Sequence, residues 1–342
     1  MATTTLVIRL SSLGDVAILI PVLYSVAVKN PDDKFLLITK KPLYPLFVNK
    51  PDNLAIFPVH TKGKHKGIWG LWRSIRDIKN AIKNFGCGAS AETALNIADL
   101  HSVIRSGVIG FYFRMRGAKI ALIDKGRKEK AALTRKNHKK ILPLKTSLER
   151  YQKVFEDLGY DASLFFTSLF PGKKEKEETW IGIAPFAKHS GKTYPLEQME
   201  IVVRLLSERP RTKIFLFGGE EDQAILETWT KKYAHLESVA GRMPFPDELA
   251  LMNQLDVMLS MDSANMHLAS LVNTPVVSVW GATHPYAGFY GFNQCMENAL
   301  QTDLPCRPCS VYGNKTCYGG DYACFYQITP EMILHQIEAN LH

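Results

Sequence analysis

The sequence has 342 residues, 46% of them hydrophobic, which is enough for two domains with cores of their own. Its formal net charge is +9, and no apolar run approaches the length of a membrane-spanning helix. Because the start, Met-Ala-Thr-Thr-Thr, lacks the basic segment and cleavage site of a signal peptide, we expect a cytoplasmic protein.

The chain opens with an apolar strand at residues 6–10, a Gly-containing turn at residues 11–15 and an apolar helix at residues 16–28. This succession is typical of a nucleotide-binding α/β domain, although the turn lacks G-x-G-x-x-G and so carries no dinucleotide fingerprint. Asp15 ends the turn, at the sheet edge where ligands bind. Its carboxylate is suited to take a proton from an attacking sugar hydroxyl. On position alone, a helix N-cap is the simpler interpretation.

Further α/β elements fill the rest of the first half. We predict strands at residues 34–39, 54–59, 87–95 and 119–124. Helices are predicted at residues 68–85 and 147–158, and a further helix between them ends at residue 113. Between Lys119 and Lys145, ten Lys and Arg residues accompany only Asp124 and Glu129. This basic run is either a solvated loop or a surface that attracts nucleic acid, acidic lipid head groups or an acidic saccharide.

A polar run at residues 171–178 is the best candidate for a domain boundary. A strand at residues 180–185 then restarts the α/β pattern, and Pro195 suits the first position of the next helix. In the loop between them, Lys192 is placed to neutralise a diphosphate leaving group. An ordinary surface lysine is the alternative interpretation.

The next strand, at residues 213–217, runs into Gly218, Gly219 and Glu220. A carboxylate at a strand end is suited to accept hydrogen bonds from vicinal ribose hydroxyls, as acidic residues do in dinucleotide sites. An acidic first turn that interacts with the helix dipole explains Glu220 equally well. A helix at residues 246–253 leads on to the most informative stretch of the sequence.

Residues 257–285 carry a polar cluster between two buried strands. Apolar runs at residues 257–261 and 275–280 flank Asp262, Ser263, Asn265 and His267, and residues 266–272 predict a short helix. Ligands of open α/β sheets bind at the carboxyl ends of strands, and a helix N-terminus there favours a phosphate. The alternative is a plain buried crossover with a capping Asp and a core His.

Four of the six cysteines lie close together near the end of the chain. Cys306, Cys309, Cys317 and Cys324 form C-x2-C-x7-C-x6-C. One C-x2-C pair is a zinc signal, but the second pair is spaced too widely for a standard zinc ribbon. Since a cytoplasmic setting argues against disulfides, we expect reduced, packed thiols and keep a structural zinc site as the alternative. A final helix is predicted at residues 329–341.

Four of these elements together resemble glycosyltransferase family 9, the bacterial heptosyltransferases, and they occur in the family's order. They are Ser11-Ser12-Leu13-Gly14-Asp15, Lys192-x-Tyr194-Pro195, Gly218-x-Glu220 and a signature that matches at Asp262, Ser263, His267, Leu268, Ala269, Thr274, Pro275, Gly281, Thr283 and Pro285. A further segment, Asp99-Leu100-His101 with Arg105-Ser106, is similar to another family element. Ala264 departs from the pattern, which has Gly there, and its methyl group either narrows the approach of a diphosphate or disfavours a positive φ. Ala187 and Lys188 replace hydroxyl residues of the family's phosphate cradle.

The resemblance implies an α/β fold of two doubly wound, Rossmann-like domains that face each other across a cleft, the GT-B fold. An N-terminal acceptor-binding domain is expected at residues 1–170, and a linker at residues 171–178. A C-terminal domain that binds the nucleotide-sugar is expected at residues 179–327. The C-terminal helix, within residues 328–342, is expected to pack back on the first domain.

The implied chemistry is that of an inverting glycosyltransferase that moves heptose from ADP-heptose to a lipopolysaccharide inner-core acceptor, with no required cofactor and no catalytic metal. Asp15 is implied as the general base, and Lys192 as the catalytic cation. The implied donor-binding residues are Ser12, Gly14, Glu220, Met243, Asp262, Ser263, Ala264 and His267. The implied acceptor-binding residues are Arg105, Arg127, Lys128, Lys130 and Arg135.

The implied partners are the nucleotide-sugar donor, an acidic lipid-linked saccharide and, peripherally, the cytoplasmic face of the inner membrane, with no nucleic acid. Two alternatives stay open. The same fold serves another nucleotide-sugar in capsule or O-antigen synthesis, or the chain is a non-catalytic protein that binds a nucleotide or nucleic acid through the basic run. The missing glycine fingerprint disfavours a nicotinamide oxidoreductase.

Overall fold

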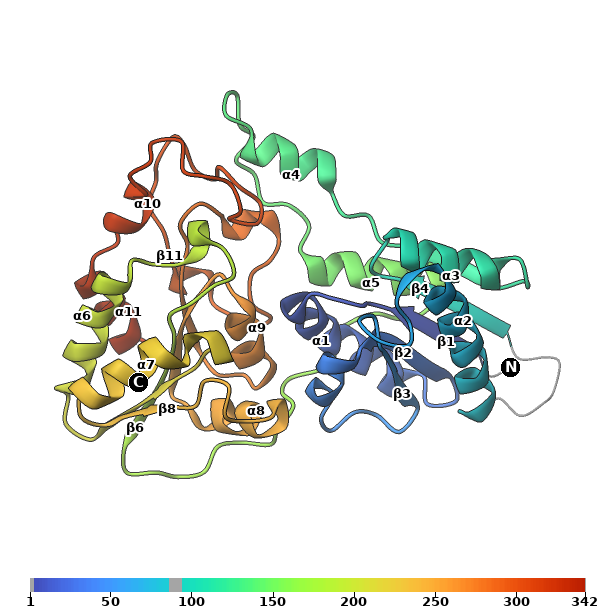
Figure 1. The fold of residues 1–342 in the computed structure, drawn as a ribbon, viewed down its shortest axis with the longest axis horizontal. Helices are drawn as coiled ribbons and strands as arrows, with labels where there is room; N and C mark the ends of the chain where they lie inside the picture. The colour runs from blue at the N-terminus through green and yellow to red at the C-terminus, as the bar shows by residue number, and fades with distance from the viewer. Residues whose placement is uncertain (1–2, 86–93, 342) are drawn as a thin grey trace. The chain divides into compact units, whose positions relative to one another are not determined.

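The computed structural model describes residues 3–85 and 94–341, and the chain forms two compact units (Figure 1). The first unit comprises Met1–Lys125 and Ser147–Phe166, and the second comprises Gly126–Thr146 and Thr167–His342. Each unit has its own parallel sheet and its own hydrophobic core.

The first unit is built on a five-stranded sheet in the order β3-β2-β1-β4-β5, in which every neighbouring pair is parallel. This order is that of a doubly wound α/β domain whose topological switch lies between β1 and β4. The strands are β1 (Thr3–Ile8), β2 (Lys34–Lys40), β3 (Leu54–Val59), β4 (Ala94–Asp99) and β5 (Lys119–Leu122). The helices are α1 (Leu13–Lys29), α2 (Gly67–Asn84), α3 (Ile104–Arg114) and α5 (Ser147–Leu158), with a 3-10 helix η1 (Lys41–Leu46).

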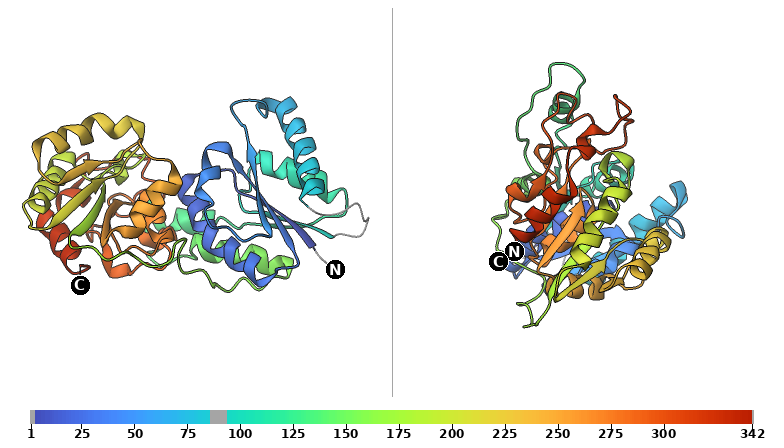
Figure 2. Two further views of the ribbon diagram at one scale, coloured as in Figure 1. Left: turned by 90° about the horizontal axis from the view of Figure 1, so that it is seen from below. Right: turned by 90° about the vertical axis from the view of Figure 1, so that its left-hand side faces the viewer.

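Helices cover both faces of this sheet (Figure 2). Apolar side chains of α2 and α3 share one core cluster with β1, β2 and β4, whereas α1 packs against α5. Helix α1 is buried continuously from residue 16 to residue 27, which explains why its sequence is apolar all round. The predicted helix at residues 147–158 is confirmed as α5. The predicted strand at residues 87–95 falls mostly outside the described residues, and the described strand is β4.

The second unit contains a six-stranded parallel sheet in the order β11-β10-β9-β6-β7-β8. Its strands are β6 (Thr179–Ala184), β7 (Thr212–Leu216), β8 (Leu236–Ser238), β9 (Val257–Met261), β10 (Val276–Val279) and β11 (Ala299–Leu300). Its helices are α4 (Arg127–Thr134), α6 (Leu196–Ser207), α7 (Gln223–Lys232), α8 (Phe245–Gln254), α9 (Ala264–Leu271), α10 (Ala323–Tyr326) and α11 (Pro330–Glu338). The 3-10 helices are η2 (Ser190–Lys192), η3 (Glu220–Asp222), η4 (Pro285–Ala287) and η5 (Met296–Asn298).

Most of the basic run, from residue 126 to residue 145, belongs to the second unit, whereas the predicted first domain included all of it. It includes helix α4 rather than loop alone. The Leu144 N–H donates to the Tyr286 carbonyl at 3.0 Å, and the Lys139 ammonium donates to the Pro308 carbonyl at 3.0 Å. These bonds explain the grouping of Gly126–Thr146 with the second unit. The predicted domain limits at residues 170 and 179 stay predictions.

The polar run at residues 171–178 is tied down rather than free. The Lys173 ammonium donates to the Leu255 carbonyl at 2.5 Å, and Lys176 pairs with Asp256 at 2.7 Å. The C-terminal helix α11 also packs within the second unit, because Ile333 and Ile337 are fully buried in the same core as α6 and β10. This buried face of α11 therefore packs in the second unit, and the expected packing of the helix on the first domain stays a prediction. Across the described residues, no helix is both long and apolar enough to span a membrane.

Candidate active site

In the first unit, the candidate residues lie where β1 ends and the chain turns into α1. Ser12 precedes the helix in extended conformation, and Asp15 is the third helical residue. Asp15 Oδ2 accepts hydrogen bonds from the Ser12 backbone N–H at 3.1 Å and from the Ser12 hydroxyl at 2.6 Å. Asp15 is therefore not the N-cap that its position alone suggested, since it reaches back to the N-cap residue.

Arg9 holds the same carboxylate oxygen. Its Nη2 lies 2.5 Å from Asp15 Oδ2, and its Nη1 donates to the Leu100 carbonyl at 2.6 Å. The Tyr151 hydroxyl donates to the Asp15 backbone carbonyl at 3.2 Å, and the Arg9 guanidinium lies 5.8 Å from the centre of the Tyr151 ring. Burial raises the pKa of Asp15, but the charge of Arg9 and the hydrogen bonds from Ser12 lower it more. The net pKa is below its ordinary value, so the carboxylate is ionised near neutral pH.

The neighbouring strand β4 brings two more polar side chains to this edge of the sheet. Asp99 is 1% exposed and accepts hydrogen bonds from the N–H groups of the second and third residues after it, at 2.9 and 2.8 Å. His101 Nδ1 accepts a hydrogen bond from the Leu10 N–H at 3.3 Å. Burial and nearby positive charge lower the pKa of His101 to about 4, so its imidazole is neutral near neutral pH.

The second unit holds an ion pair among its candidate residues. Lys192 Nζ lies 2.8 Å from Asp262 Oδ2, and the Thr283 hydroxyl donates to the same oxygen at 2.7 Å. These residues follow β6, β9 and β10, which are neighbours in the sheet, so the carboxyl ends of the strands bring them together. An ammonium has three N–H donors, and the ion pair therefore leaves donors of Lys192 for another acceptor.

Backbone contacts hold the Lys192 loop in place. The Ala282 N–H donates to the Gly191 carbonyl at 2.9 Å, and the Gly191 N–H donates to the Gly313 carbonyl at 3.2 Å. A Cβ on Gly191 would lie 2.7 Å from the Gly313 carbonyl oxygen, so a side chain does not fit between these strands of chain. Glycine at this position lets three loops meet at the lysine.

Helix α9 begins beside this ion pair. Ser263 is its N-cap residue in extended conformation (φ −140°), and its hydroxyl lies 3.2 Å from that of Ser260. Ala264 is the first helical residue and does not have the positive φ that a family glycine would allow, so its methyl group causes no backbone strain. His267 lies one turn further on and is 7% exposed. The first N–H groups of α9 are thus available beside Asp262.

Glu220 and Met243 lie at the same carboxyl edge, after β7 and β8. Both are exposed. Gly241 has φ +62°, and a Cβ there would come within 2.9 Å of Glu220 Cγ, so the two loops approach each other closely. The structure therefore brings Glu220 and the loop of Met243 together along the rim of the second sheet.

Arg307 supports the Thr283 loop and was not singled out from the sequence. Its side chain donates to the carbonyls of Gly281 at 2.5 Å, Trp280 at 3.1 Å and Thr283 at 2.9 Å. The residue is 5% exposed. A buried guanidinium that donates to several carbonyls fixes the loop that carries them. Here that loop carries Thr283, whose hydroxyl donates to Asp262 beside Lys192. Arg307 stands inside the C-x2-C segment, whose spacing points only to the cysteines.

A family model described as glycosyltransferase family 9 (heptosyltransferase) matches residues 100–317. This chain belongs to glycosyltransferase family 9. The family 9 protein is 22% identical over 287 residues to lipopolysaccharide heptosyltransferase 3 of Escherichia coli, covering 79% of this chain and 81% of that relative. It is therefore a glycosyltransferase.

Solved structures show the fold class of this family 9 enzyme. A glycosyl transferase family 9 structure from Veillonella parvula matches with a TM-score of 0.75 at 19% identity, covering 99% of this chain and 97% of that one. The E. coli heptosyltransferase WaaC with ADP-2-deoxy-2-fluoro heptose matches with a TM-score of 0.65 at 19% identity, covering 99% and 100%. The predicted fold class, two Rossmann-like domains of the GT-B type, is confirmed.

The residues expected to bind the acceptor belong to both units of the family 9 enzyme. Arg105, in the first unit, donates to the His65 carbonyl at 2.9 Å. The second unit holds Lys130, which is 8% exposed, with its ammonium 4.1 Å from the centre of the Phe289 ring. Lys130 is thus buried beside an aromatic ring, and its expected part in acceptor binding stays a prediction. The exposed basic residues of this set in the second unit are Arg127, Lys128 and Arg135.

The clustered cysteines are free thiols. Cys309 and Cys324 are buried, Cys317 is partly buried and Cys306 is exposed. Burial raises the pKa of Cys309, and raises that of Cys324 to about 11, so both stay protonated near neutral pH. Within residues 3–85 and 94–341, no group of three or more His, Cys, Asp or Glu side chains is arranged to hold a metal ion. The alternative structural zinc site at these four cysteines stays a prediction.

Proposed function

We propose that this glycosyltransferase moves heptose from ADP-heptose to a lipopolysaccharide inner-core acceptor, with inversion at the anomeric carbon. The E. coli relative is named a lipopolysaccharide heptosyltransferase, and a structure of similar fold contains an ADP-heptose analogue. The observation that carries the mechanism is the ionised Asp15 carboxylate at the end of β1, ready to accept a proton. The first unit then supplies the base, the second binds the donor, and basic residues of both units bind the acceptor.

In the proposed reaction, Asp15 takes the proton from the acceptor hydroxyl as its oxygen attacks the anomeric carbon. The bond between that carbon and the diphosphate oxygen breaks, and ADP leaves with the electron pair. Since Asp15 Oδ2 is occupied by Arg9 and Ser12, the other carboxylate oxygen accepts the proton. Ser12 and Gly14 belong to the same turn and contact the sugar of the donor.

The leaving diphosphate needs positive charge. Lys192 keeps its bond to Asp262 and donates hydrogen bonds from its remaining N–H groups to the phosphate. The first N–H groups of α9, at Ser263 and Ala264, donate further hydrogen bonds to the same phosphate. His267 lies on the same helix one turn behind. Because these groups balance the charge, the proposal includes no divalent cation.

At the rim of the second sheet, the Glu220 carboxylate accepts hydrogen bonds from the ribose hydroxyls of the donor, and Met243 contacts the adenine. Both residues are exposed, and both follow strand ends on the edge that carries Lys192. The acceptor is an acidic, lipid-linked saccharide, so Arg105, Arg127, Lys128 and Arg135 offer complementary charge to its phosphates and carboxylates. A lipid-linked acceptor places the reaction at a membrane surface.

The test is an ADP-release assay with ADP-heptose and an inner-core acceptor, in which the parent is compared with Asp15→Asn. We expect turnover to fall about a hundredfold or more, because an amide cannot take the proton. Binding of ADP is expected to stay unchanged, since Asp15 belongs to the first unit. Asp157→Asn, at an exposed carboxylate on α5, is the matched control and is expected to leave turnover unchanged.

Three results would contradict parts of the proposal. Equal turnover by Asp15→Asn and the parent would remove the general base. Faster release of nucleotide from a UDP- or GDP-sugar than from ADP-heptose would mean that the donor is another nucleotide-sugar, as in capsule or O-antigen synthesis. A loss of turnover after addition of EDTA would show that Lys192 and α9 do not suffice to balance the diphosphate.

A further inference from the structure

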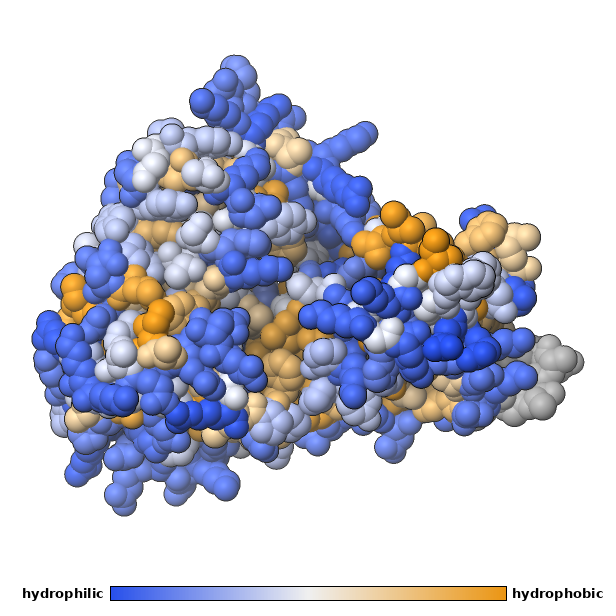
Figure 3. Space-filling model, viewed as in Figure 1, coloured by the Kyte–Doolittle hydropathy of each residue, from blue (hydrophilic) through white to orange (hydrophobic). Residues whose placement is uncertain are grey.

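Two helices of the first unit expose large apolar side chains that the proposed reaction does not use. On α2, Ile68 is 75% exposed and Trp69 is 87% exposed, and Trp72 is exposed as well. On α3, Ile104 is 88% exposed, and Phe111 is exposed two turns further on. We call these five side chains the apolar face. In Figure 3, strongly hydrophobic side chains gather on the surface over α3.

Helix α3 is apolar on two opposite sides. Its inward side buries Ile109 and Phe113 in the core of the first unit. Its outward side carries Ile104, Phe111 and, just after the helix, Met115, which is 69% exposed. These three are spaced at i, i+7 and i+11, so they form one stripe along the helix. A surface helix with a second apolar stripe has a face that a further apolar environment would cover.

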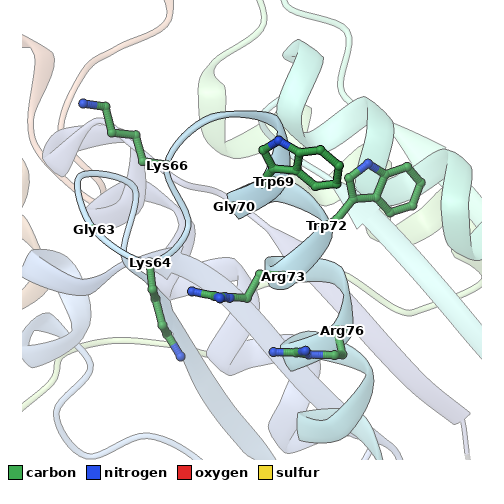
Figure 4. A pocket seen from close by; sticks show the side chains of 8 residues that line it. All are labelled: Gly63, Lys64, Lys66, Trp69, Gly70, Trp72, Arg73 and Arg76. Carbon is green, nitrogen blue, oxygen red and sulfur yellow. The ribbon is translucent and has the colours of Figure 1, made fainter.

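The surroundings of the apolar face are strongly basic. Residues 61–84 and 100–117 together contain ten Lys and Arg residues and a single carboxylate, Asp77. A hollow of about 560 Å³ beside α2 is lined by Trp69 and Trp72 together with four cations (Figure 4). Those cations are Lys64, Lys66, Arg73 and Arg76.

Only part of this charge is neutralised. Asp77 lies 3.0 Å from the Lys64 ammonium and 3.7 Å from Arg76 Nε. Within residues 3–85 and 94–341, neither Lys66 nor Arg73 has an ion-pair partner, and both are exposed. The hollow therefore carries net positive charge, is lined in part by tryptophan, and is suited to an anionic group.

The loop that forms the hollow is built rigidly. His65 is fully buried; its Nδ1 accepts a hydrogen bond from the His60 N–H at 3.0 Å, and its Nε2 lies 3.2 Å from Asp77. Arg105, in the first turn of α3, donates to the His65 carbonyl and so joins the two helices. A Cβ on Gly70 would lie 2.2 Å from the His65 carbonyl carbon, so the loop rests directly on α2. The apolar face and the cations are thereby held as one surface.

We infer that this surface docks on a lipid bilayer that contains anionic phospholipids, with the apolar face at the level of the head groups and an anionic head group in the hollow. Tryptophan is enriched at membrane interfaces, and basic residues beside an apolar helix face are typical of helices that lie in the interface. Lys66 and Arg73 add attraction to the negative surface potential.

Other occupants fit this surface less well. Single-stranded nucleic acid would use the tryptophans and cations but would leave the aliphatic side chains Ile68 and Ile104 without a partner. A second copy of the chain in a two-fold dimer would place the same ten cations against each other, and like charges repel. The combination of aliphatic, tryptophan and basic residues therefore favours the bilayer.

This inference rests on the proposed function only for the lipid-linked nature of the acceptor, since a bilayer-bound enzyme would meet such an acceptor at its own surface. Docking itself is measurable without donor or acceptor. A failure of docking and a failure of heptose transfer are thus separate results.

The test is flotation of the full chain with vesicles of phosphatidylcholine alone and of phosphatidylcholine mixed with phosphatidylglycerol. We expect the parent to bind the mixed vesicles, and we expect Trp69→Ala/Trp72→Ala to bind them about tenfold more weakly. Lys66→Glu/Arg73→Glu is expected to bind them about 25-fold more weakly or worse, at about fivefold for each of the two cations removed. All four residues are exposed, so unchanged circular dichroism is expected for both variants.

The matched controls are on other surfaces of the first unit. Phe165→Ala removes an aromatic side chain that is 69% exposed, and Lys41→Glu/Lys50→Glu reverses two exposed cations. Both are expected to bind vesicles like the parent, and all variants are expected to release ADP with a delipidated saccharide acceptor at the parent's rate.

Several outcomes would overturn the inference. One is equal binding of the parent to neutral and mixed vesicles. Another is full binding by Trp69→Ala/Trp72→Ala, or equal loss in the controls. Loss of RNA binding or of a dimer in these variants, with vesicle binding unchanged, would assign the surface to nucleic acid or to a second copy instead. Vesicle binding without any ADP release would leave the docking surface in place and remove the proposed transfer.

Discussion

Arg9 sets the state of the proposed base, because it contributes a full positive charge 2.5 Å from Asp15 Oδ2. Burial alone would raise the pKa of Asp15, and Arg9 with Ser12 reverses the direction. A base acts only when ionised, so activity falls as the pH drops through its pKa. Because the net pKa of Asp15 is lowered, this loss is expected for the parent only below the pH range in which an ordinary aspartate titrates.

Arg9→Met should move this acid limb upward. Without the guanidinium, burial dominates, and we expect the limb of kcat against pH to shift by about one pH unit or more toward neutral pH. Arg9→Lys keeps the charge and is expected to retain most of the parent's profile. A uniform loss of kcat at every pH in Arg9→Met, with no shift of the limb, would mean that Arg9 only holds the turn through its bond to the Leu100 carbonyl.

Residue types at the site could be predicted from the sequence, but their partners could not. Asp15, Lys192 and Asp262 each stand in a local pattern after a strand, and the pairing of Lys192 with Asp262 follows from adjacent strand ends. Arg9 and Arg307 stand in no such pattern. Their roles come from carbonyls 91 and 26 positions away, at Leu100 and Gly281, and no local spacing records such a contact.

At the scale of elements, the loop after β10 depends on one close approach. A Cβ on Gly281 would lie 2.1 Å from the Phe325 ring, which is buried in the core of the second unit. We expect Gly281→Ala to lower the free energy of unfolding by about 1–3 kcal/mol, because the ring or the loop must shift. It is also expected to weaken ADP binding, since the same loop carries Thr283 to Asp262. Urea denaturation and ADP titration measure the two effects.

Gly172→Ala is the matched control, because a Cβ there would meet nothing within 4 Å. It is expected to leave both the denaturation midpoint and ADP affinity unchanged. If Gly281→Ala behaves like this control, Phe325 does not confine the loop, and the position of Thr283 must depend on Arg307 alone.

Regular elements with a clear apolar period were predictable, and charged segments were not. The helix at residues 147–158 appears as predicted, because apolar residues recur on one side of it. Helix α4 was not predicted, because its charged composition is that of a solvated loop. The side chain that packs it on the second unit is the buried Lys130, beside Phe289. The polar run at residues 171–178 suggested a free linker, yet Lys173 and Lys176 bind the second unit. A lysine in a sequence does not show whether its ammonium reaches a carbonyl.

For the whole molecule, the alternation of strands and helices predicted two parallel α/β units, and the two sheets are present. The path of the chain between them was not predictable. Residues 126–146 join the second unit before the chain returns to α5 in the first. Their place in the second unit comes with bonds such as that of Leu144 to Tyr286, which join segments far apart in the sequence.

Two separate cores mean that a ligand of one unit stabilises that unit first. If ADP binds at Lys192 and the start of α9, exchange of backbone amides should slow in residues 186–195 and 262–271. At an ADP concentration of about 100 times Kd, the slowing is expected to reach about 100-fold where exchange needs opening of the second unit. The buried strands β1 and β2 serve as an internal control and are expected to exchange as before.

Hydrogen exchange read by mass spectrometry also separates this site from other nucleotide sites. Lys192→Met removes the charge that we propose meets the phosphate, so ADP at the same concentration should leave exchange of this variant almost unchanged. Slower exchange confined to β1 and α1 would instead place the nucleotide in the first unit. In that case the proposed division of labour would be reversed, with Asp15 beside the nucleotide and Lys192 outside the reaction.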